Sequence, residues 1–331
     1  MKTVKSSNFA ALTSTRRSAL AVIAGLAVAG ASWAQGAFPD KPIRVVVPFG
    51  AGSSPDVISR LWGEQLSKAV GQPVIIDNKP GAATIIGTQA VLAAPADGYT
   101  LLYTVSNTTS INPYIYKNLP YKAEDLMPVS RILSVPLVLV VSANSPIKSV
   151  QQLVQAGKEK PGKMNYASYG IGISTHVAMA RFLSSAGISM THVPYKDGGL
   201  IDVMNGNVDV SFEPSTTAMG QLKAGKLRAL GVSSLKSVAA LPGVPPIADV
   251  YPGFVGDSWH GILAAKGTPA AVINKIAGIS QQIIDSEEFR KRLTDLGLVP
   301  AGGSIREFQA FMAEDAKAWA KVVKDYDIKA E

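Results

Sequence analysis

The chain has 331 residues, with 32 Lys and Arg against 24 Asp and Glu, which gives a formal net charge of +8, and it contains no cysteine. Without cysteine it can form no disulfide and cannot be a lipoprotein attached through an N-terminal Cys. Basic residues form no stripe and are not interleaved with aromatic ones, so nucleic-acid binding is not expected. This length suits about two domains that bury large cores.

The first 34 residues have the layout of a secretory signal. A segment with four Lys or Arg residues and no acid precedes an apolar run over residues 19–30. This run is shorter than the roughly 17 to 25 apolar residues that span a bilayer, which disfavours the alternative of an uncleaved membrane anchor. Ser32 and Ala34 supply the small residues of a cleavage site. We therefore expect cleavage after about Ala34 and a mature protein in the periplasm.

The route of export is open. Arg16 and Arg17 are compatible with the twin-arginine route, in which a protein is exported already folded. Ala19, however, stands where that signal usually carries a bulky apolar residue. The general secretory route is the alternative.

Strand-like and helix-like segments alternate after the signal, which is typical of βαβ units around parallel sheets. In chain order we expect strands over 43–48, 73–77 and 100–105, and helices over 55–70 and 84–93. A connection rich in Pro and Tyr follows over 112–128. The apolar strand expected over 135–142 is long enough to cross into a second lobe.

The second lobe begins with a helix over 149–157, which Ser149 and Gln152 open as a capping-box pair. Four strands are expected over 164–167, 190–193, 208–212 and 227–232, with helical segments between them. A proline-dense loop over 241–252 leads to a short apolar strand over 261–265, a candidate for the return crossing. No internal repeat of fixed period is visible.

The C-terminal part is predicted to be helical. Thr268 precedes Pro269 in the order of an N-cap followed by proline in the first turn, and apolar residues then recur at helical spacing. Ser304 and Glu307 predict a capping box for the last helix. We expect these helices to pack back on the first lobe.

The turn after the first strand offers a rival function, since Gly50 and Gly52 lie between a strand and a helix and Asp77 ends the second strand. This is close to a dinucleotide-binding fingerprint. The third glycine, which allows close helix-to-strand packing, is replaced by Pro55. An exported chain also has no cytosolic nicotinamide pool, so this function is disfavoured.

Hydrolase and metal chemistry have weak signals. A nucleophile elbow requires G-x-S-x-G, and the nearest match, over 166–170, lacks the first glycine. The histidines at 176, 192 and 260 are scattered, with no ligand spacing and no cysteine to complete a zinc site. We interpret them as structural or rim residues.

Loops that follow the expected strands are rich in Gly, Ser, Thr and Asn. They cover residues 49–56, 81–84, 106–110, 168–175, 194–199 and 213–217. In α/β sheets such loops gather at the carboxyl ends of the strands, where helix N-termini present unpaired N–H groups and partial positive charge. Helix capping alone is the alternative explanation for each loop. The surplus of hydroxyls favours a polar pocket that binds an anion without Arg or Lys.

Seven short segments stand out by their order along the chain. They are KPIR (41–44) leading to VPF (47–49), NKPGA (78–82), DGYTLL (97–102), PGKMNY (161–166), HVPYK (192–196), AGKLRAL (224–230) and LPGVPP (241–246). In this order they resemble the Bug (TctC-type) extracytoplasmic solute receptors of tripartite tricarboxylate transport systems. The resemblance covers nearly the whole mature chain.

The resemblance implies an α/β, two-lobe periplasmic binding protein-like (type II) fold, with mixed, mostly parallel sheets and helices on both faces. Lobe 1 would comprise residues 35–137 and 263–331, and lobe 2 residues 138–262. Two crossing strands would form the hinge.

The resemblance also implies a ligand site. The residues are Phe49, Gly52, Ser53, Ser54 and Asp56 for a first grip, Ser168, Gly170, Ser174 and Thr175 for the opposing grip, and Ser106, Asn107, Thr108 and Tyr195 for the walls. The family usually has Gly-Gly and a hydroxyl residue before the helical Asp, whereas Ser53-Ser54-Pro55 stands here. These side chains would narrow the pocket or add hydroxyl donors. Asp56 would contact the ligand directly, through water, or only cap the helix.

The predicted function is capture of a small mono- or dicarboxylate, aliphatic or aromatic, by a solute-binding protein that serves a tripartite tricarboxylate-type permease. No catalytic residue, cofactor, metal or nucleic acid is expected, and the protein is expected to be a monomer. An exported hydrolase and a ligand-sensing receptor component that use the same cleft are the alternatives. Sequence does not separate sensing from transport.

Overall fold

The computed structural model of the chain describes residue 1, residues 38–326 and residues 328–330. Apart from Met1, the expected signal and its cleavage site lie outside these residues. The chain divides into residues 1–40 and a compact unit from Lys41 to the C-terminus, and every described helix and strand belongs to the second unit. Among the described residues, no helix is both long and apolar enough to cross a membrane.

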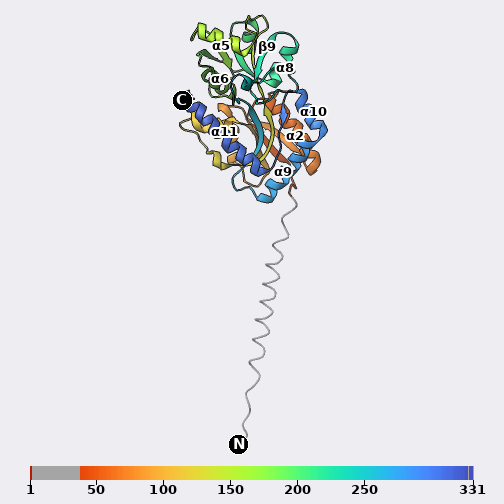
Figure 1. Cartoon of the computed structure of the whole chain (residues 1–331). Coiled ribbons are helices and arrows are strands. Elements are labelled where there is room, and N and C mark those ends of the chain that lie inside the picture. The colour runs from red at the N-terminus through yellow and green to blue at the C-terminus, as the bar shows by residue number, and fades with distance from the viewer. Residues whose placement is uncertain (2–37, 327, 331) are drawn as a thin grey trace. The chain divides into compact units, whose positions relative to one another are not determined.

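Six strands form the first sheet, which lies in the lower half of the compact unit as drawn in Figure 1. Their order is β11-β4-β10-β3-β1-β2. β1, β2 and β3 pair in parallel, whereas β10 runs antiparallel to its neighbours β3 and β4. The run of Val and Ile in β1 suits its inner place, because strands covered on both faces are apolar throughout. The strands are β1 (Ile43–Val47), β2 (Val74–Asn78), β3 (Thr100–Val105), β4 (Leu126–Val135), β10 (Ser258–Ala265) and β11 (Val299–Pro300).

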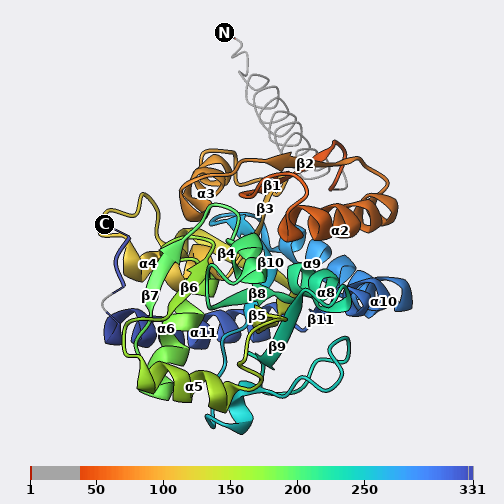
Figure 2. The same ribbon diagram turned by 90° about the horizontal axis from the view of Figure 1, so that it is seen from above.

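Five strands form the second sheet, in the order β7-β6-β8-β5-β9 (Figure 2). β6 is parallel to β7 and β8, while β5 is antiparallel to β8 and β9. The strands are β5 (Leu137–Ser142), β6 (Asn165–Ser168), β7 (Thr191–Pro194), β8 (Val210–Pro214) and β9 (Leu227–Val232). The mixed α/β fold with two sheets is therefore confirmed. Antiparallel pairing is more frequent than expected, because β4, β5 and β10 run against their neighbours.

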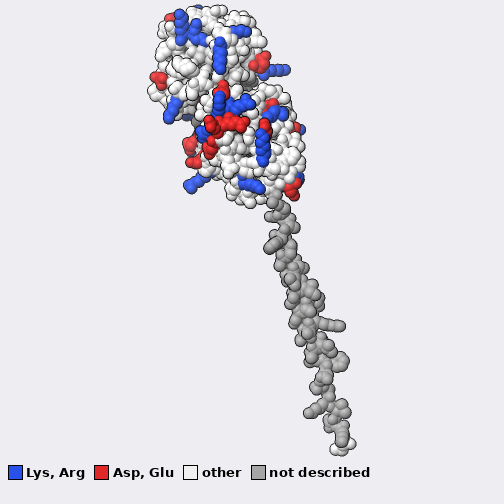
Figure 3. Space-filling model, turned by 90° about the vertical axis from the view of Figure 1, so that its right-hand side faces the viewer, with Lys and Arg blue, Asp and Glu red and all other residues white. Residues whose placement is uncertain are grey.

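Helices fill the connections. They are α2 (Ser54–Val70), α3 (Ile85–Leu92), α4 (Asn112–Ile115), α5 (Val150–Glu159), α6 (Ser174–Ala186), α7 (Leu200–Asn205), α8 (Ser215–Lys223), α9 (Ala270–Asp285), α10 (Glu287–Asp295) and α11 (Ile305–Asp325), with short turns η2 (Ala82–Thr84), η3 (Asn107–Ile111), η4 (Ala123–Asp125) and η5 (Ile247–Asp249). On the face shown in Figure 3, basic and acidic side chains are interspersed.

Two of the three expected helix caps are present. Ser149 caps α5 by accepting a hydrogen bond from the Gln152 amide, and Ser304 and Glu307 form the reciprocal box that begins α11. The cap expected at Thr268 is wrong, because Pro269 occupies the N-cap position of α9. The Thr268 hydroxyl instead donates to the Ala265 carbonyl at 2.7 Å.

The chain passes between the two sheets twice. The strand expected over 135–142 is divided at Pro136, since proline has no N–H for the ladder, and its two parts belong to different sheets. The return passage runs from the end of β9 at Val232 to the start of β10 at Ser258. The expected lobe boundary between residues 262 and 263 therefore lies inside β10. This strand begins at Ser258, earlier than the expected residue 261. The polar Ser258 and His260 interrupt the apolar run that predicted the strand, although both are buried in it.

The last helix packs on both sheets. Near its start, Phe308 meets Trp259 of β10 edge to face, with ring centroids 5.3 Å apart. Further along, Trp319, Val322 and Val323 belong to the core that includes Phe212 of β8. The expectation that the C-terminal helices pack on the first lobe holds for α9, which contacts β4 and α2. It is incomplete for α11, which bridges the two sheets.

Candidate ligand-binding site

A cavity of about 350 Å³ opens between the two sheets. Residues that belong to or lead from the six-stranded sheet contribute Phe49, Gly52, Ser53, Ser54, Pro55, Val105, Asn107, Val135, Ser258 and His260. Those of the five-stranded sheet contribute Leu137, Tyr169, Ile173, Ser174, Thr175, Lys196, Pro214, Thr216 and Thr217. Loops after β1, β6, β7 and β8 thus meet in one place, as expected for the carboxyl ends of strands.

A larger cavity, of about 660 Å³, lies elsewhere. It is lined mainly by the connection over 113–128 and by one side of α11. No N-terminus of α2, α6 or α8 contributes to it. We take the smaller cavity as the candidate site because loops of both sheets converge on it.

Three helices begin at the candidate site. Ser53, Ile173 and Pro214 are the N-caps of α2, α6 and α8, which have 17, 13 and 9 residues. None of these three N-caps makes a side-chain capping hydrogen bond to its helix. Their first-turn N–H groups therefore keep a free bonding direction and a partial positive charge toward the cavity. Capping does not account for the hydroxyls in these loops.

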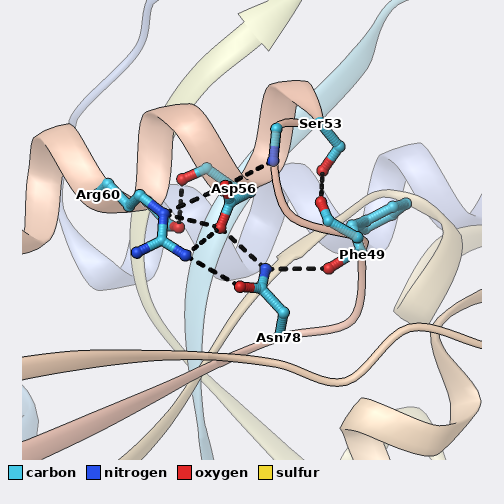
Figure 4. Close-up of polar contacts among 8 residues, drawn as sticks. Phe49, Ser53, Asp56, Arg60 and Asn78 are labelled. Carbon is cyan, nitrogen blue, oxygen red and sulfur yellow. Dashed lines mark hydrogen bonds and ion pairs between the residues drawn. The ribbon is translucent and has the colours of Figure 1, made fainter.

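The Gly loop after β1 is held from behind by Asp56 (Figure 4). The Asp56 carboxylate accepts hydrogen bonds from the Gly52 amide at 2.8 Å, from Arg60 Nε at 3.0 Å and from Asn78 Nδ2 at 2.8 Å. Asn78 also donates to the Phe49 carbonyl at 3.0 Å. Burial by itself raises the pKa of Asp56, but the bonds from Arg60, Gly52 and Asn78 outweigh it and leave this pKa below its ordinary value.

Two hydroxyls at the cavity lack a protein partner. Ser54 Oγ from α2 and Thr216 Oγ1 from α8 are buried atoms with no hydrogen bond within the described structure. They come from opposite sides of the cavity. A buried hydroxyl without a partner is costly, so both are ready to bond a ligand that bridges the two sides.

Seven of the residues implied by the resemblance line the cavity. They are Phe49, Gly52, Ser53, Ser54, Asn107, Ser174 and Thr175. Asp56 is not among the lining residues and instead positions the Gly loop behind it. The cavity lining therefore gives no support to a direct contact between Asp56 and a ligand. The hydrogen bonds of Asp56 to Gly52 and Asn78 show instead that it orders the loop.

Five other implied residues lie outside the lining, and each has partners within the protein. Ser106 Oγ bonds Ser258 Oγ at 2.9 Å, and Thr108 Oγ1 bonds the hydroxyls of Thr84 and Thr104. Ser168 and Gly170 bond each other within the loop after β6. Tyr195 donates its hydroxyl to Asp202 at 2.7 Å. These residues support the walls.

Sequence reasoning missed several lining residues. Thr216 and Thr217 lie in the first turn of α8, within the hydroxyl-rich segment 213–217, and the resemblance does not assign them to the site. Lys196 follows Tyr195 in the loop after β7, and it is the one charged residue among the described lining residues, since His260 is buried and its pKa is lowered to about 3. Nothing in the sequence indicates that His260 lines the cavity, because a histidine within an apolar strand is usually a structural residue.

Ser168 and His192 have part of a hydrolase geometry, with Oγ and Nε2 2.6 Å apart. Ser168 has no exposed surface, and neither residue lines the cavity. His192 stacks on Tyr166 and on His176, with ring centroids 4.8 and 4.1 Å away. Burial lowers the pKa of both histidines, that of His176 to about 4. In this geometry Ser168 and His192 contribute to packing, because the buried serine is not accessible to a substrate.

Solved structures of similar proteins share this architecture. R. palustris Rpa4515 with adipate matches with a TM-score of 0.82 and 29% identity, over 88% of this chain and 99% of that one. The periplasmic binding protein BugD matches with a TM-score of 0.78 and 29% identity, over 88% and 99%. MatC (Rpa3494) from Rhodopseudomonas palustris with bound malate matches with a TM-score of 0.77 and 26% identity, over 86% and 100%.

Sequence comparison gives the same relationship. The family model described as tripartite tricarboxylate transporter family receptor, TctC, matches residues 58–328. A UPF0065 protein from the tcbD-tcbE intergenic region of Pseudomonas sp. (strain P51) is 35% identical, over 93% of this chain and 95% of that protein. Protein BugT of Bordetella pertussis is 32% identical, over 88% and 91%. The chain therefore belongs to the TctC, or Bug, family of tripartite tricarboxylate transporter receptors, which are periplasmic solute-binding proteins.

Proposed function

We propose that this protein captures a small carboxylate in the periplasm and presents it to a tripartite tricarboxylate-type permease, without catalysing a reaction. The convergence of three uncapped helix N-termini on one cavity carries this proposal. An anion near a helix N-terminus gains about 0.3–1 kcal/mol per helix, and up to about 2 kcal/mol where it is partly buried. No acidic residue is found among the described lining residues, and Lys196 adds a positive charge.

Capture works by closing two lobes, one built on each sheet. α2 and α6 start on different sheets, so a ligand that accepts N–H and O–H donors from both is bound best when the lobes are together. A ligand shifts the equilibrium only by its differential affinity for the closed form. The two chain passages at Pro136 and over 233–257 form the hinge, and α11 limits its range because it packs on both sheets.

The ligand class follows from the relatives as well as from the site. Adipate and malate, bound by two structural neighbours, are small aliphatic dicarboxylates. Ser54 Oγ and Thr216 Oγ1 lie on opposite walls and have no partner, which suits a ligand with acceptors at both ends. The cavity of about 350 Å³ is large enough for such an acid. The protein acts as a monomer, since one chain supplies both walls.

A hydrolase that uses Ser168 is the weaker alternative. Its serine is buried and outside the cavity, so turnover of an ester and its loss in Ser168→Ala would contradict the receptor function. A sensing role uses the same capture step and differs only in the protein that recognises the closed form.

Thermal unfolding of the exported protein with a panel of acids tests the proposal. Adipate, malate and benzoate are compared with glucose and with ethanolamine at the same concentrations. A true ligand at 100 times its dissociation constant adds roughly 2.7 kcal/mol to the free energy of unfolding. A rise in melting temperature with glucose or ethanolamine, and with no acid, would show that the site does not select carboxylates.

A double variant tests the position of the site. Ser174→Ala with Thr175→Ala removes two hydroxyls at the start of α6 and should weaken binding of the acid at least tenfold. The melting temperature without ligand should fall modestly, because Thr175 Oγ1 accepts a hydrogen bond from the Tyr169 amide at 3.2 Å. The matched control is Ser184→Ala with Ser185→Ala, in the last turn of the same helix and outside the cavity lining. Equal affinity in both double variants would show that the ligand does not bind at the start of α6.

A further inference from the structure

Glu213 is a buried acid directly behind the wall of the candidate site. It stands near the carboxyl end of β8, has no exposed surface, and precedes the start of α8 by two residues. Its Oε2 accepts a hydrogen bond from the hydroxyl of Tyr169 at 3.0 Å. The Thr217 hydroxyl lies 3.4 Å from the same oxygen, but its shorter acceptor is the Pro214 carbonyl at 2.9 Å. Tyr169 and Thr217 both line the cavity. The acid thus holds the Tyr169 hydroxyl at the border of the ligand space.

Glu213 can change its ionisation state near neutral pH. Burial raises its pKa to about 7, against hydrogen bonds from Ser211, Tyr169 and Thr217 that lower it, and the nearby Asp197 raises it further. The titratable groups that face it are Tyr169, from the loop after β6, and Asp197, from the loop after β7. Lys196 lines the same cavity. The phenol of Tyr169 stays neutral, because burial raises its pKa above the ordinary value.

The charge of Glu213 decides where the hydroxyl protons point. An ionised carboxylate only accepts, so Tyr169 donates toward it and turns its oxygen lone pairs to the cavity. When Oε2 carries the proton, the carboxyl can donate its own O–H to the Tyr169 oxygen. The Tyr169 O–H is then released to donate into the cavity, where an anionic ligand needs donors. Ionised Glu213 also repels such a ligand through a medium of low dielectric constant.

We propose that Glu213 is a positioning residue that takes up one proton from solvent when an anionic ligand binds, and so turns the Tyr169 hydroxyl toward the ligand. This inference rests on the proposed carboxylate-binding function and adds its regulation. Affinity for the acid then falls as pH rises through neutrality, because the proton must be supplied to an ionised Glu213. A ligand that leaves the protein releases the proton with it.

Calorimetric titration with adipate tests the inference. Binding is measured at pH 7 in phosphate and in Tris, whose ionisation heats differ, which gives the number of protons taken up by the unmodified protein. We expect net uptake of a fraction of a proton. Affinity should fall about tenfold or more between pH 6.5 and pH 8.5, a range in which a carboxylate ligand with a pKa near 4 stays ionised. No uptake and equal affinity at both pH values would overturn the inference.

Two variants assign the proton to Glu213. Glu213→Gln keeps the shape of the neutral acid and should bind adipate equally well at pH 6.5 and pH 8.5. The matched control is Asp257→Asn, which removes another acid whose pKa burial raises to about 7 but which does not itself line the cavity or bond Tyr169, and it should keep the pH dependence. The opposite pattern, with dependence lost in Asp257→Asn and kept in Glu213→Gln, would overturn the assignment.

Tyr169→Phe gives a second test that keeps the Glu213 carboxyl in place and removes its bond to the Tyr169 hydroxyl. Its hydroxyl serves the ligand only when Glu213 is neutral, so the variant should lose affinity at pH 6.5 and change little at pH 8.5. Equal losses at both pH values would contradict the turning of the hydroxyl. If no carboxylate binds at any pH, the proposed function fails together with this inference, whereas binding that is independent of pH removes the inference alone.

Discussion

Asp56 and Glu213 are buried acids on opposite sides of the cavity, with 3% and 0% of their surface exposed. Burial raises the pKa of Asp56, but bonds from a guanidinium, a backbone amide and a side-chain amide outweigh it and leave this pKa below its ordinary value. Burial also raises the pKa of Glu213, to about 7, and its three partners are hydroxyls. Glu213 is enclosed more deeply than Asp56 and has no charged donor, so its pKa rises whereas that of Asp56 falls.

The difference shows that depth of burial and the donors around a carboxyl together decide its charge. Donors that cannot turn, such as the Gly52 amide, fix a permanent carboxylate and with it the shape of a loop. Hydroxyls can donate or accept, so the acid they surround is free to change its charge near neutral pH. One side of the cavity is thus a rigid frame and the other an adjustable wall.

The largest expected effect concerns the pH dependence of stability. Glu213 has a pKa of about 7 when folded and an ordinary value of 4.5. The unfolded chain therefore loses this proton first, and stability is lost as pH rises from 4.5 through 7, by up to about 3 kcal/mol. Glu213→Gln should lack this share of the loss. Urea unfolding at pH 5 and pH 8 measures it.

Asp257 contributes a loss of the same sign in both proteins, so the difference between the two pH slopes isolates Glu213. Equal slopes would show that Glu213 is ionised in the folded protein. In that case the two buried acids would not differ, and the comparison would fail.

Asp56→Ala should come next in size. The Gly52 amide and Asn78 amide lose their acceptor, which costs about 1–3 kcal/mol of the free energy of unfolding. We expect little from the Arg60 ion pair, because half of the Arg60 side chain is exposed to solvent. The variant should also bind adipate at least tenfold more weakly, since the Gly loop is no longer held. Urea unfolding and calorimetry provide the two values.

The matched control for Asp56→Ala is Asp295→Ala, whose carboxylate pairs with Lys291 on the surface of α10. It should cost less than about 1 kcal/mol and leave binding unchanged. If Asp56→Ala behaves like this control, Asp56 is not the anchor of the loop.

The smallest expected effect belongs to Lys196→Met. Removing the one charged lining residue should weaken adipate binding about tenfold, equal to about 1.4 kcal/mol, and more at low than at high ionic strength. Lys158→Met, on the exposed face of α5 and outside the cavity, is the control and should change neither value. Unchanged affinity in Lys196→Met would leave the helix N-termini as the whole source of positive potential.

Periodicity and apolar runs predicted most of the fold. Nine of the eleven described strands, all except β4 and β11, were expected within about three residues of their observed positions. Buried strands in α/β sheets form apolar runs in the sequence, which makes them easy to predict. β4 was missed since Pro128, Ser130 and Arg131 interrupt its apolar pattern. Those residues are tolerated because β4 lies beside the edge and under α11, where Arg131 stacks on Phe311, 3.5 Å from the ring centroid.

The site was predictable in part. Hydroxyl-rich loops and family resemblance placed Phe49, Ser54 and Ser174 among the candidates, and they line the cavity. Ser106, Thr108 and Tyr195 have the same residue types in the same kinds of loop, yet their side chains bond other parts of the protein. Composition cannot distinguish the two groups, because the direction of a side chain depends on what packs behind it.

The sequence by itself determined that the chain carries an export signal pattern, that it forms alternating strands and helices, and that its loops offer hydroxyls and helix starts to an anion. These are properties of local pattern and composition. Only the tertiary structure decided which loops meet. It also decided that Asp56 holds the loop after β1 and that Glu213 is buried behind the Tyr169 hydroxyl of the cavity wall. Burial and hydrogen-bond partners set the charge of both acids, and both depend on residues far apart in the chain.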